Sequence, residues 1–191
     1  SVDFDDLLIL PLQIFSKFPE CLEYYQNKFK YVLVDEYQDT NKPQFEFVYS
    51  IACKHKDIFV VGDDDQSIYG WRGADISNIL NFKDAFGSAT VIKLEQNYRS
   101  TKNILEAAWS VVSKNIDRAE KKLWTKNKKG KLISIIKAND ERQEAKEIVE
   151  NIKLHKDNLK EVAVLYRTNS QSRTIEDQLR RESAAGFDIS Y

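Results

Sequence analysis

Short apolar runs alternate with amphipathic stretches along the chain, and this alternation predicts an α/β fold with parallel sheets. Two of the runs, at residues 31–35 and 57–63, end in a carboxylate and are typical of buried parallel strands. Similar runs predict further strands at residues 90–94, 131–137 and 161–167. Apolar residues at helical spacing predict the helices, one near the N-terminus ending at residue 16 and others at residues 20–29, 43–52, 76–86, 101–112, 140–152 and 172–182.

Asp35 and Glu36 follow the first predicted strand and are candidates for catalytic chemistry. In open α/β sheets, ligands bind beyond the carboxyl ends of the strands, so both carboxylates would lie at a ligand site. One can bind Mg²⁺ while the other accepts a proton from an attacking water, which suits a magnesium–nucleotide site. Taken alone, an Asp-Glu pair is more often part of a solvated loop.

The loop after the second predicted strand combines an amide, two aromatic rings and a guanidinium. Gln66 can present its amide to a phosphate or to an attacking water. Tyr69, Trp71 and Arg72 could form a surface that stacks on bases and contacts phosphates, or the two rings could pack in the core. The acids at residues 63–65 could bind a second metal ion, but we expect them to fix the turn and its neighbours.

Tyr98 and Arg99 lie at a predicted strand-to-helix junction, on the ligand side of the sheet. A tyrosine there can stack on adenine, and an arginine can neutralise charge on a transferred phosphoryl group. Ser100 or Thr101 is expected to cap the helix that follows. The lysine-rich segment at residues 121–131 is expected to be a solvated loop, with contact to a phosphate backbone as the alternative.

Composition narrows the class of protein. The 191 residues are 42% hydrophobic and 31% charged, which is enough apolar sequence for a packed core. Because 29 basic and 30 acidic residues nearly cancel, a surface that binds nucleic acid must be local. Cys21 and Cys53 fit a reducing compartment, so we expect a cytoplasmic protein. No segment is apolar enough for a membrane span, and without methionine at position 1 we expect a piece of a longer protein.

Five segments of distinctive sequence follow one another: DFDDLL at residues 3–8, VDEYQDTN at 34–41, VGDDDQSIYGWRGAD at 61–75, LEQNYRST at 94–101 and VAVLYRTN at 162–169. Together they resemble the UvrD/PcrA/Rep class of superfamily 1 DNA helicases. The first resembles the helix upstream of Walker B, the second the Walker B segment, and the others the third motif, the fourth motif and the segment after it. They run in family order and span nearly the whole chain, so the combined match is far more specific than any one segment.

The resemblance implies how the chain would bind and hydrolyse ATP with Mg²⁺. Asp35 would coordinate the metal, and Glu36 would be the general base for the attacking water. Gln66 would sense the γ-phosphate and couple it to DNA. Tyr98 would stack on adenine, and Arg99 would reach the γ-phosphate.

The resemblance also implies a DNA-binding surface and a biological setting. Tyr69 and Trp71 would stack on single-stranded bases, with Arg72 close to the strand. The parent protein would be a DNA-stimulated ATPase that moves 3′ to 5′ on single-stranded DNA and unwinds duplexes at junctions. DNA repair is the expected pathway, repair proteins are candidate partners, and no membrane is expected.

The family has two RecA-like motor domains with ATP between them, so the resemblance implies a partial helicase core of parallel sheets flanked by helices. Residues 1–94 would be the later part of the first domain, and residues 95–191 the beginning of the second. The phosphate-binding loop G-x-x-x-x-G-K-[ST] and the family's C-terminal motifs are absent, and residues 183–191 depart from the family pattern. Without that loop the phosphates lose most of their binding groups, so we expect the chain alone to be inactive.

Two other functions remain open. A degenerate motor could act as a DNA-binding or scaffold subunit, although such a subunit has no physical need of the intact acid, amide and arginine set. The chain could also be the motor portion of a helicase–nuclease.

Overall fold

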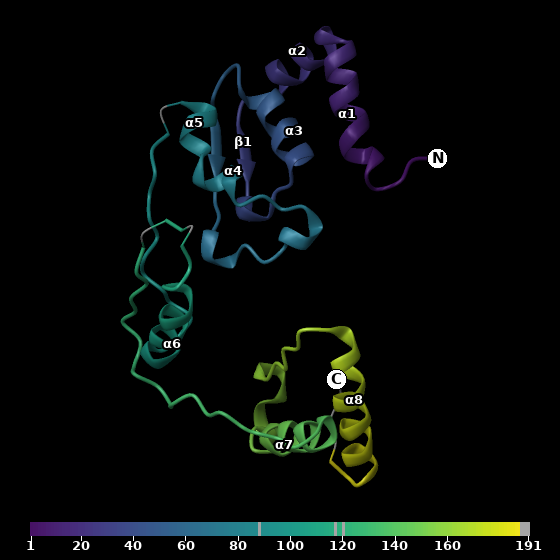
Figure 1. Ribbon diagram of the computed structural model, residues 1–191, viewed down its shortest axis with the longest axis vertical. Helices are drawn as coiled ribbons and strands as arrows, with labels where there is room; N and C mark the ends of the chain where they lie inside the picture. Colours follow the sequence, from purple (N-terminus) through teal and green to yellow (C-terminus); the bar gives the residue numbers. More distant parts are fainter. Residues whose placement is uncertain (88, 117, 120, 188–191) are drawn as a thin grey trace. The chain divides into compact units, whose positions relative to one another are not determined.

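The computed structural model describes residues 1–87, 89–116, 118, 119 and 121–187 (Figure 1). The chain divides into two compact units, Ser1–Lys131 and Leu132–Tyr191, which are considered separately. The domain boundary predicted between residues 94 and 95 falls inside the first unit, because residues after this boundary form hydrogen bonds with residues before it. As a boundary between two motor domains it stays a prediction.

A parallel pair of strands, β1 (Val32–Val34) and β2 (Ile58–Val60), lies at the centre of the first unit. Both lie within the runs predicted to be strands, and Leu33 is paired with Phe59. Leu33 is 73% exposed and Phe59 60% exposed, whereas their neighbours along each strand are half-buried. Among the described elements, therefore, only one face of this sheet is covered, and the strands are less buried than the apolar runs predict.

Three helices pack together beside the sheet: α1 (Asp6–Lys17), α2 (Pro19–Lys28) and α3 (Lys42–Ala52). All three confirm predicted helices. The buried ring of Phe15 in α1 contacts Tyr25 of α2, with 5.9 Å between ring centroids, and stacks on Phe47 of α3 at 5.8 Å. Asn41 and Gln44 form a reciprocal capping box at the start of α3, which fixes where the chain leaves the loop after β1.

The single helix predicted at residues 76–86 is wrong, because the chain forms two short helices there, α4 (Ser77–Leu80) and α5 (Phe82–Phe86). Asn81 separates them with non-helical dihedral angles. The break lets Phe82 meet Tyr37 edge to face, with 5.6 Å between the ring centroids, so packing overrides the helical pattern. Gly87 ends α5 with a φ of 83°, in the position expected for a C-terminal glycine.

The strand predicted at residues 90–94 is also wrong, since no described segment forms a ladder with it. Pairing begins later, with a parallel bridge between Gln96 and Trp124. Helix α6 (Lys102–Val112) then begins as predicted, but its N-cap residue Thr101 makes no side-chain cap hydrogen bond. The Thr101 side chain lies against Gly130, where a Cβ would come within 2.5 Å of its hydroxyl oxygen.

The second unit is built on helices α7 (Glu141–Lys153) and α8 (Asn169–Ala184), with η4 (Lys156–Glu161) between them. Asp140 caps α7 as predicted, accepting a hydrogen bond of 2.7 Å from the backbone nitrogen of Gln143. The core joins three buried residues to partly buried apolar neighbours: Val149, Ile152 and Leu179, with Ile148, Leu159, Val162, Val164 and Ile175.

The strands predicted at residues 131–137 and 161–167 are wrong in the described part of this unit, where neither segment finds a neighbour to pair with. Val162 and Val164 instead pack on the helices, while Leu165 is 94% exposed. A strand needs hydrogen bonds from another segment, and an apolar run cannot supply them by itself. Helix α8 continues past its predicted end at residue 182 to Ala184, and the last residues of the chain, 188–191, lie outside the described residues.

Replacing Tyr37 by Phe tests the core between β1 and α5. The Tyr37 ring is fully buried, its hydroxyl has no hydrogen-bond partner among the described residues, and burial raises its pKa to about 12. A buried hydroxyl without a partner costs roughly 1–3 kcal/mol. We therefore expect Tyr37→Phe to leave the free energy of unfolding unchanged or to raise it by about 1 kcal/mol in urea titrations.

Tyr24→Phe is the matched control, because that ring is 58% exposed. A change within about 0.5 kcal/mol is expected there. A clear loss of stability in Tyr37→Phe would show that an ordered water bonds the hydroxyl.

Candidate functional site

Asp35 and Glu36 lie directly after β1, where the sequence predicts a ligand site, and both side chains are exposed. Glu36 has φ 49° and ψ 44°, a left-handed conformation that costs a non-glycine residue of the order of 1–3 kcal/mol. The Asp35 Oδ1 atom accepts a hydrogen bond of 2.9 Å from the Glu36 backbone nitrogen and so helps to hold this turn. A strained backbone held in this way is typical of functional loops.

Gln38 connects the loop after β1 to the loop after β2. Its side chain is 1% exposed, and its Nε2 atom donates to Glu36 Oε2 at 2.8 Å. Its Oε1 atom accepts a hydrogen bond of 3.0 Å from the backbone nitrogen of Asp63. Gln38 is not among the residues predicted from the sequence, and the only signal for it was its place two residues after Glu36 in the segment at 34–41.

Gly62 lets the two loops approach each other. A Cβ at this position would lie 2.6 Å from Gln38 Oε1 and 3.2 Å from the Tyr37 backbone nitrogen. Any larger side chain would therefore push the loops apart or displace the Gln38 amide.

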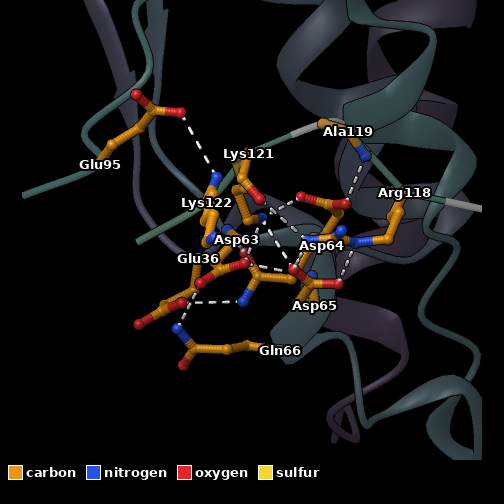
Figure 2. Close-up of polar contacts among 11 residues, drawn as sticks. Glu36, Asp63, Asp64, Asp65, Gln66, Glu95, Arg118, Ala119, Lys121 and Lys122 are labelled. Carbon is orange, nitrogen blue, oxygen red and sulfur yellow. Dashed lines mark hydrogen bonds and ion pairs between the residues drawn. The ribbon is translucent and has the colours of Figure 1, made fainter. Parts of the chain in front are cut away.

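Gln66 lies on the turn that follows, at the end of η2 (Asp64–Gln66). Its exposed side chain donates from Nε2 to Asp63 Oδ2 at 2.8 Å. The Asp63 carboxylate therefore accepts a hydrogen bond from the Gln66 amide, and the Asp63 backbone nitrogen donates one to Gln38. Glu36 and Gln66 come from different loops, and two intermediate residues join them in one network (Figure 2).

Two basic residues beyond α6 form ion pairs with the acids at residues 63–65. Arg118 forms a bidentate pair with Asp65, at 3.0 Å from Nε and 2.8 Å from an Nη nitrogen. Lys121 bonds to both Asp63 and Asp64, and the cluster is seen together in Figure 2. Oxygens of the acids lie within 4.8 Å of one another, but these cations already occupy them. The acids thus fix the turn and its neighbours.

The ion pairs shift the pKa values of Asp63, Asp65 and Lys121. A hydrogen bond from Arg118 lowers the pKa of Asp65, against the effect of burial. Burial raises the pKa of Asp63, but hydrogen bonds from Lys121 and Gln66 outweigh it and the net pKa is lowered. Burial lowers the pKa of Lys121, but the hydrogen bonds from its ammonium to the acids outweigh this effect, so the net pKa is raised. All these groups are therefore charged near neutral pH.

Tyr69 and Trp71 lie in the exposed loop around η3 (Gly70–Arg72), and not in the core. Tyr69 is 39% exposed and Trp71 67% exposed. The Arg72 guanidinium lies over both rings, 5.5 Å and 4.6 Å from their centroids. Two exposed rings with a cation beside them form the kind of surface that binds bases and phosphates.

The aromatic loop is anchored to the end of the segment at residues 34–41. Ala74 pairs with Asn41 in an antiparallel bridge, and the Asp75 backbone nitrogen donates to the Thr40 carbonyl at 3.0 Å. A displacement of the loop would therefore also move the segment that carries Glu36.

Tyr98 and Arg99 lie in a separate exposed turn. The Asn97 side chain accepts hydrogen bonds from the backbone nitrogens of Arg99, at 3.0 Å, and Ser100, at 2.7 Å. Tyr98 is 77% exposed. Within the described residues, no hydrogen bond or ion pair joins their side chains to Asp35, Glu36 or Gln66, so their contacts with a nucleotide stay a prediction.

The lysine-rich segment at residues 121–131 is a loop, as expected, and runs beside residues 95–103. Lys121 is ion-paired, whereas the lysines that follow are exposed: Lys122, Lys126, Lys128, Lys129 and Lys131. Contact between these lysines and a phosphate backbone stays a prediction.

Comparison with known proteins shows to which family the chain belongs. Residues 1–87 match the model of the UvrD/REP helicase N-terminal domain, and residues 92–190 match that of the UvrD-like helicase C-terminal domain. The chain belongs to the UvrD-like helicase family. This match confirms the predicted family and its α/β, RecA-like fold class, of which β1 and β2 are the strands that the structure describes.

Relatives of the UvrD-like chain include two staphylococcal proteins named ATP-dependent DNA helicase PcrA. The Staphylococcus epidermidis protein is 52% identical over 186 residues, and a Staphylococcus aureus protein is 51% identical over the same length. Each alignment covers 96% of this chain and 26% of the relative, so the chain spans about a quarter of their length. Among the helices that the structure describes, none combines the length and apolar character needed to cross a membrane.

The acidic turn should make the stability of the chain depend on pH. A carboxylate whose pKa is lowered on folding stabilises the fold above its ordinary pKa of about 4, and this stabilisation is lost as pH falls through the folded value. Asp65→Asn removes one such carboxylate and leaves Arg118 without its charged partner. We expect this variant to be less stable than the unchanged chain near neutral pH, and its stability to fall less steeply below about pH 4 in urea titrations.

Asp84→Asn is the matched control, because Asp84 is exposed and its carboxylate makes no hydrogen bond or ion pair within the described residues. Parallel pH profiles for Asp65→Asn and Asp84→Asn would contradict the assignment of the acid dependence to the ion-paired turn.

Proposed function

We propose that this chain is part of an ATP-dependent DNA helicase whose motor moves 3′ to 5′ along single-stranded DNA and unwinds duplexes at single-strand/double-strand junctions. The observation that carries the proposal is the linked pair of Glu36 and Gln66, which Gln38 and Asp63 join across two loops. A base and a phosphate-sensing amide in one network suit coupled ATP hydrolysis. The staphylococcal relatives bear the name of ATP-dependent DNA helicases.

Asp35 would hold Mg²⁺ beside the phosphates of ATP. Its Oδ1 atom accepts a hydrogen bond from the Glu36 backbone nitrogen, while nothing in the described part of the chain donates a hydrogen bond to Oδ2. An exposed carboxylate oxygen of this kind fits Mg²⁺, which prefers oxygen ligands and keeps several of its waters. When bound, the ion would neutralise charge that develops on the phosphates.

Glu36 would accept the proton of the attacking water. The Gln38 amide donates to Oε2 and so fixes the carboxylate, while Oε1 is left for the water. A base positioned in this way contributes roughly 10²–10⁴ to the rate.

Gln66, Tyr98 and Arg99 would complete the nucleotide site. Gln66 is exposed at the end of its turn and would contact the γ-phosphate with its amide. Tyr98 would stack on adenine, and Arg99 would reach the γ-phosphate, where a guanidinium neutralises charge in the transition state. Support for the last two roles is their exposure in the turn before α6 and their place in the LEQNYRST segment.

Tyr69, Trp71 and Arg72 would bind single-stranded DNA. Their support is the exposure of both rings and the guanidinium that lies over them. Stacking of one base on an aromatic side chain contributes about 1–3 kcal/mol. Because the loop is anchored at Thr40 and Asn41, DNA bound there could be coupled to Glu36. A role in DNA repair, repair proteins as partners and a cytoplasmic location belong to the same proposal.

Glu36→Gln is the decisive variant in the full-length protein that carries this chain. The amide cannot take a proton, so DNA-stimulated ATP hydrolysis should fall by roughly 10²–10⁴, with nucleotide binding largely retained. Phosphate release with and without single-stranded DNA, and equilibrium binding of an ATP analogue, measure the two quantities.

Glu106→Gln is the control, since Glu106 is exposed on α6 and its side chain makes no polar contact with other described residues. Its turnover should equal that of the unchanged protein. Absence of turnover in the unchanged protein, with DNA binding retained, would favour a DNA-binding or scaffold subunit.

The 191 residues alone are expected to show neither ATP hydrolysis above background nor duplex unwinding. They contain no G-x-x-x-x-G-K-[ST] segment, whose backbone amides and lysine supply most of the binding to the β- and γ-phosphates. Turnover by the purified chain that Glu36→Gln abolishes would contradict this expectation.

A further inference from the structure

Arg118, Ala119 and Lys121 attach the stretch beyond α6 to the turn that carries Gln66 (Figure 2). These residues follow α6 and lie more than 50 positions from the turn in sequence, yet both segments belong to the compact unit Ser1–Lys131. The turn lies in the part of the chain matched by the N-terminal helicase domain, and residues 118–121 in the part matched by the C-terminal domain. The contact therefore connects segments of two family domains.

Lys121 and Gln66 bind the same carboxylate. The Lys121 Nζ atom bonds to Asp63 Oδ1, and the Gln66 amide bonds to Asp63 Oδ2 at 2.8 Å. Asp63 Oδ1 also accepts the backbone nitrogen of Asp65 at 3.1 Å. Lys121 therefore adds a charged donor to the oxygen that the Asp65 backbone nitrogen also holds, and so strengthens the hold on the carboxylate that sets the direction of the Gln66 amide.

Arg118 serves as the anchor of the same segment. Its guanidinium pairs with Asp65 through two nitrogens and lies 4.8 Å from the centroid of the Trp109 ring on α6. The backbone nitrogen of Ala119 adds a hydrogen bond of 2.7 Å to Asp64. These contacts hold the segment in place without Lys121, so loss of the Lys121 ammonium should loosen Asp63 while the segment stays attached.

We propose that Lys121 is a positioning residue for ATP hydrolysis, which orients the Gln66 amide through the Asp63 carboxylate. The inference rests on the proposed function, because it requires Gln66 to contact the γ-phosphate. It adds a residue from the part matched by the C-terminal helicase domain to the residues that contact or orient groups at the nucleotide. A shift of Lys121 relative to the turn would then change the direction of the Gln66 amide and alter hydrolysis.

The test is a double-mutant cycle in the full-length protein, with Lys121→Met, Gln66→Ala and the two combined. Methionine keeps the aliphatic stem and removes the ammonium. We expect Lys121→Met to lower the DNA-stimulated kcat by roughly tenfold, as small displacements of catalytic groups do, with KM for ATP changed by less than about twofold. In the Gln66→Ala background, Lys121→Met should have no further effect on kcat, because the group that it positions is gone.

Two further variants separate positioning from folding. Lys121→Arg keeps a charged donor and should retain most of kcat, whereas Lys114→Ala, an exposed lysine just beyond α6, should behave as the unchanged protein. Thermal melting of every variant shows whether each is folded at the assay temperature. If Lys121→Met is unfolded there, the cycle is run with Lys121→Gln, which keeps a neutral donor.

The outcomes are distinct. If the unchanged protein shows no DNA-stimulated hydrolysis, the proposed function fails, and the inference fails with it. If that hydrolysis is present, but Lys121 and Gln66 substitutions lower kcat independently and their effects multiply, the inference alone is overturned. Failure of Lys121→Arg to retain more activity than Lys121→Met would also overturn it, since the positioning depends on a charged donor.

Discussion

The close approach of the loops after β1 and β2 is the constraint on which the candidate site depends. Parallel pairing of the two short strands delivers both loops to the same edge of the sheet. Gly62 leaves room for the Gln38 amide, which bonds to Glu36 on one loop and to the Asp63 backbone on the other. A buried amide with partners on both loops fixes their separation, because an unpaired polar group there would be costly.

Charge is the second constraint. Adjacent carboxylates that are partly removed from water repel one another unless cations offset them. Arg118 and Lys121 supply the positive charge, and in doing so bring a distant segment to the turn that carries Gln66. The same contacts therefore stabilise the turn and connect it to the stretch beyond α6. Stability and the geometry of the candidate site share one set of ion pairs.

Several predicted strands show where sequence reasoning fails. The apolar runs at residues 90–94, 131–137 and 161–167 have the composition of strands, yet none of them has a ladder within the described residues. An apolar run records only that a segment favours burial, whereas a strand also needs a neighbour at hydrogen-bonding distance. The helices were predicted more accurately, because their hydrogen bonds and caps lie within a few residues, as at Asn41 and Asp140.

The sequence by itself determined the family, the α/β class, most helices and the identity of the candidate residues, because motifs and helical periodicity are local properties of the chain. Tertiary structure alone decided that Tyr69 and Trp71 are exposed and that Gln38 is buried between two loops. It also decided that residues 63–65 are bound by Arg118 and Lys121. Burial and ion pairing join residues that are distant in sequence, and no local pattern specifies which of the many lysines and arginines a given acid will meet.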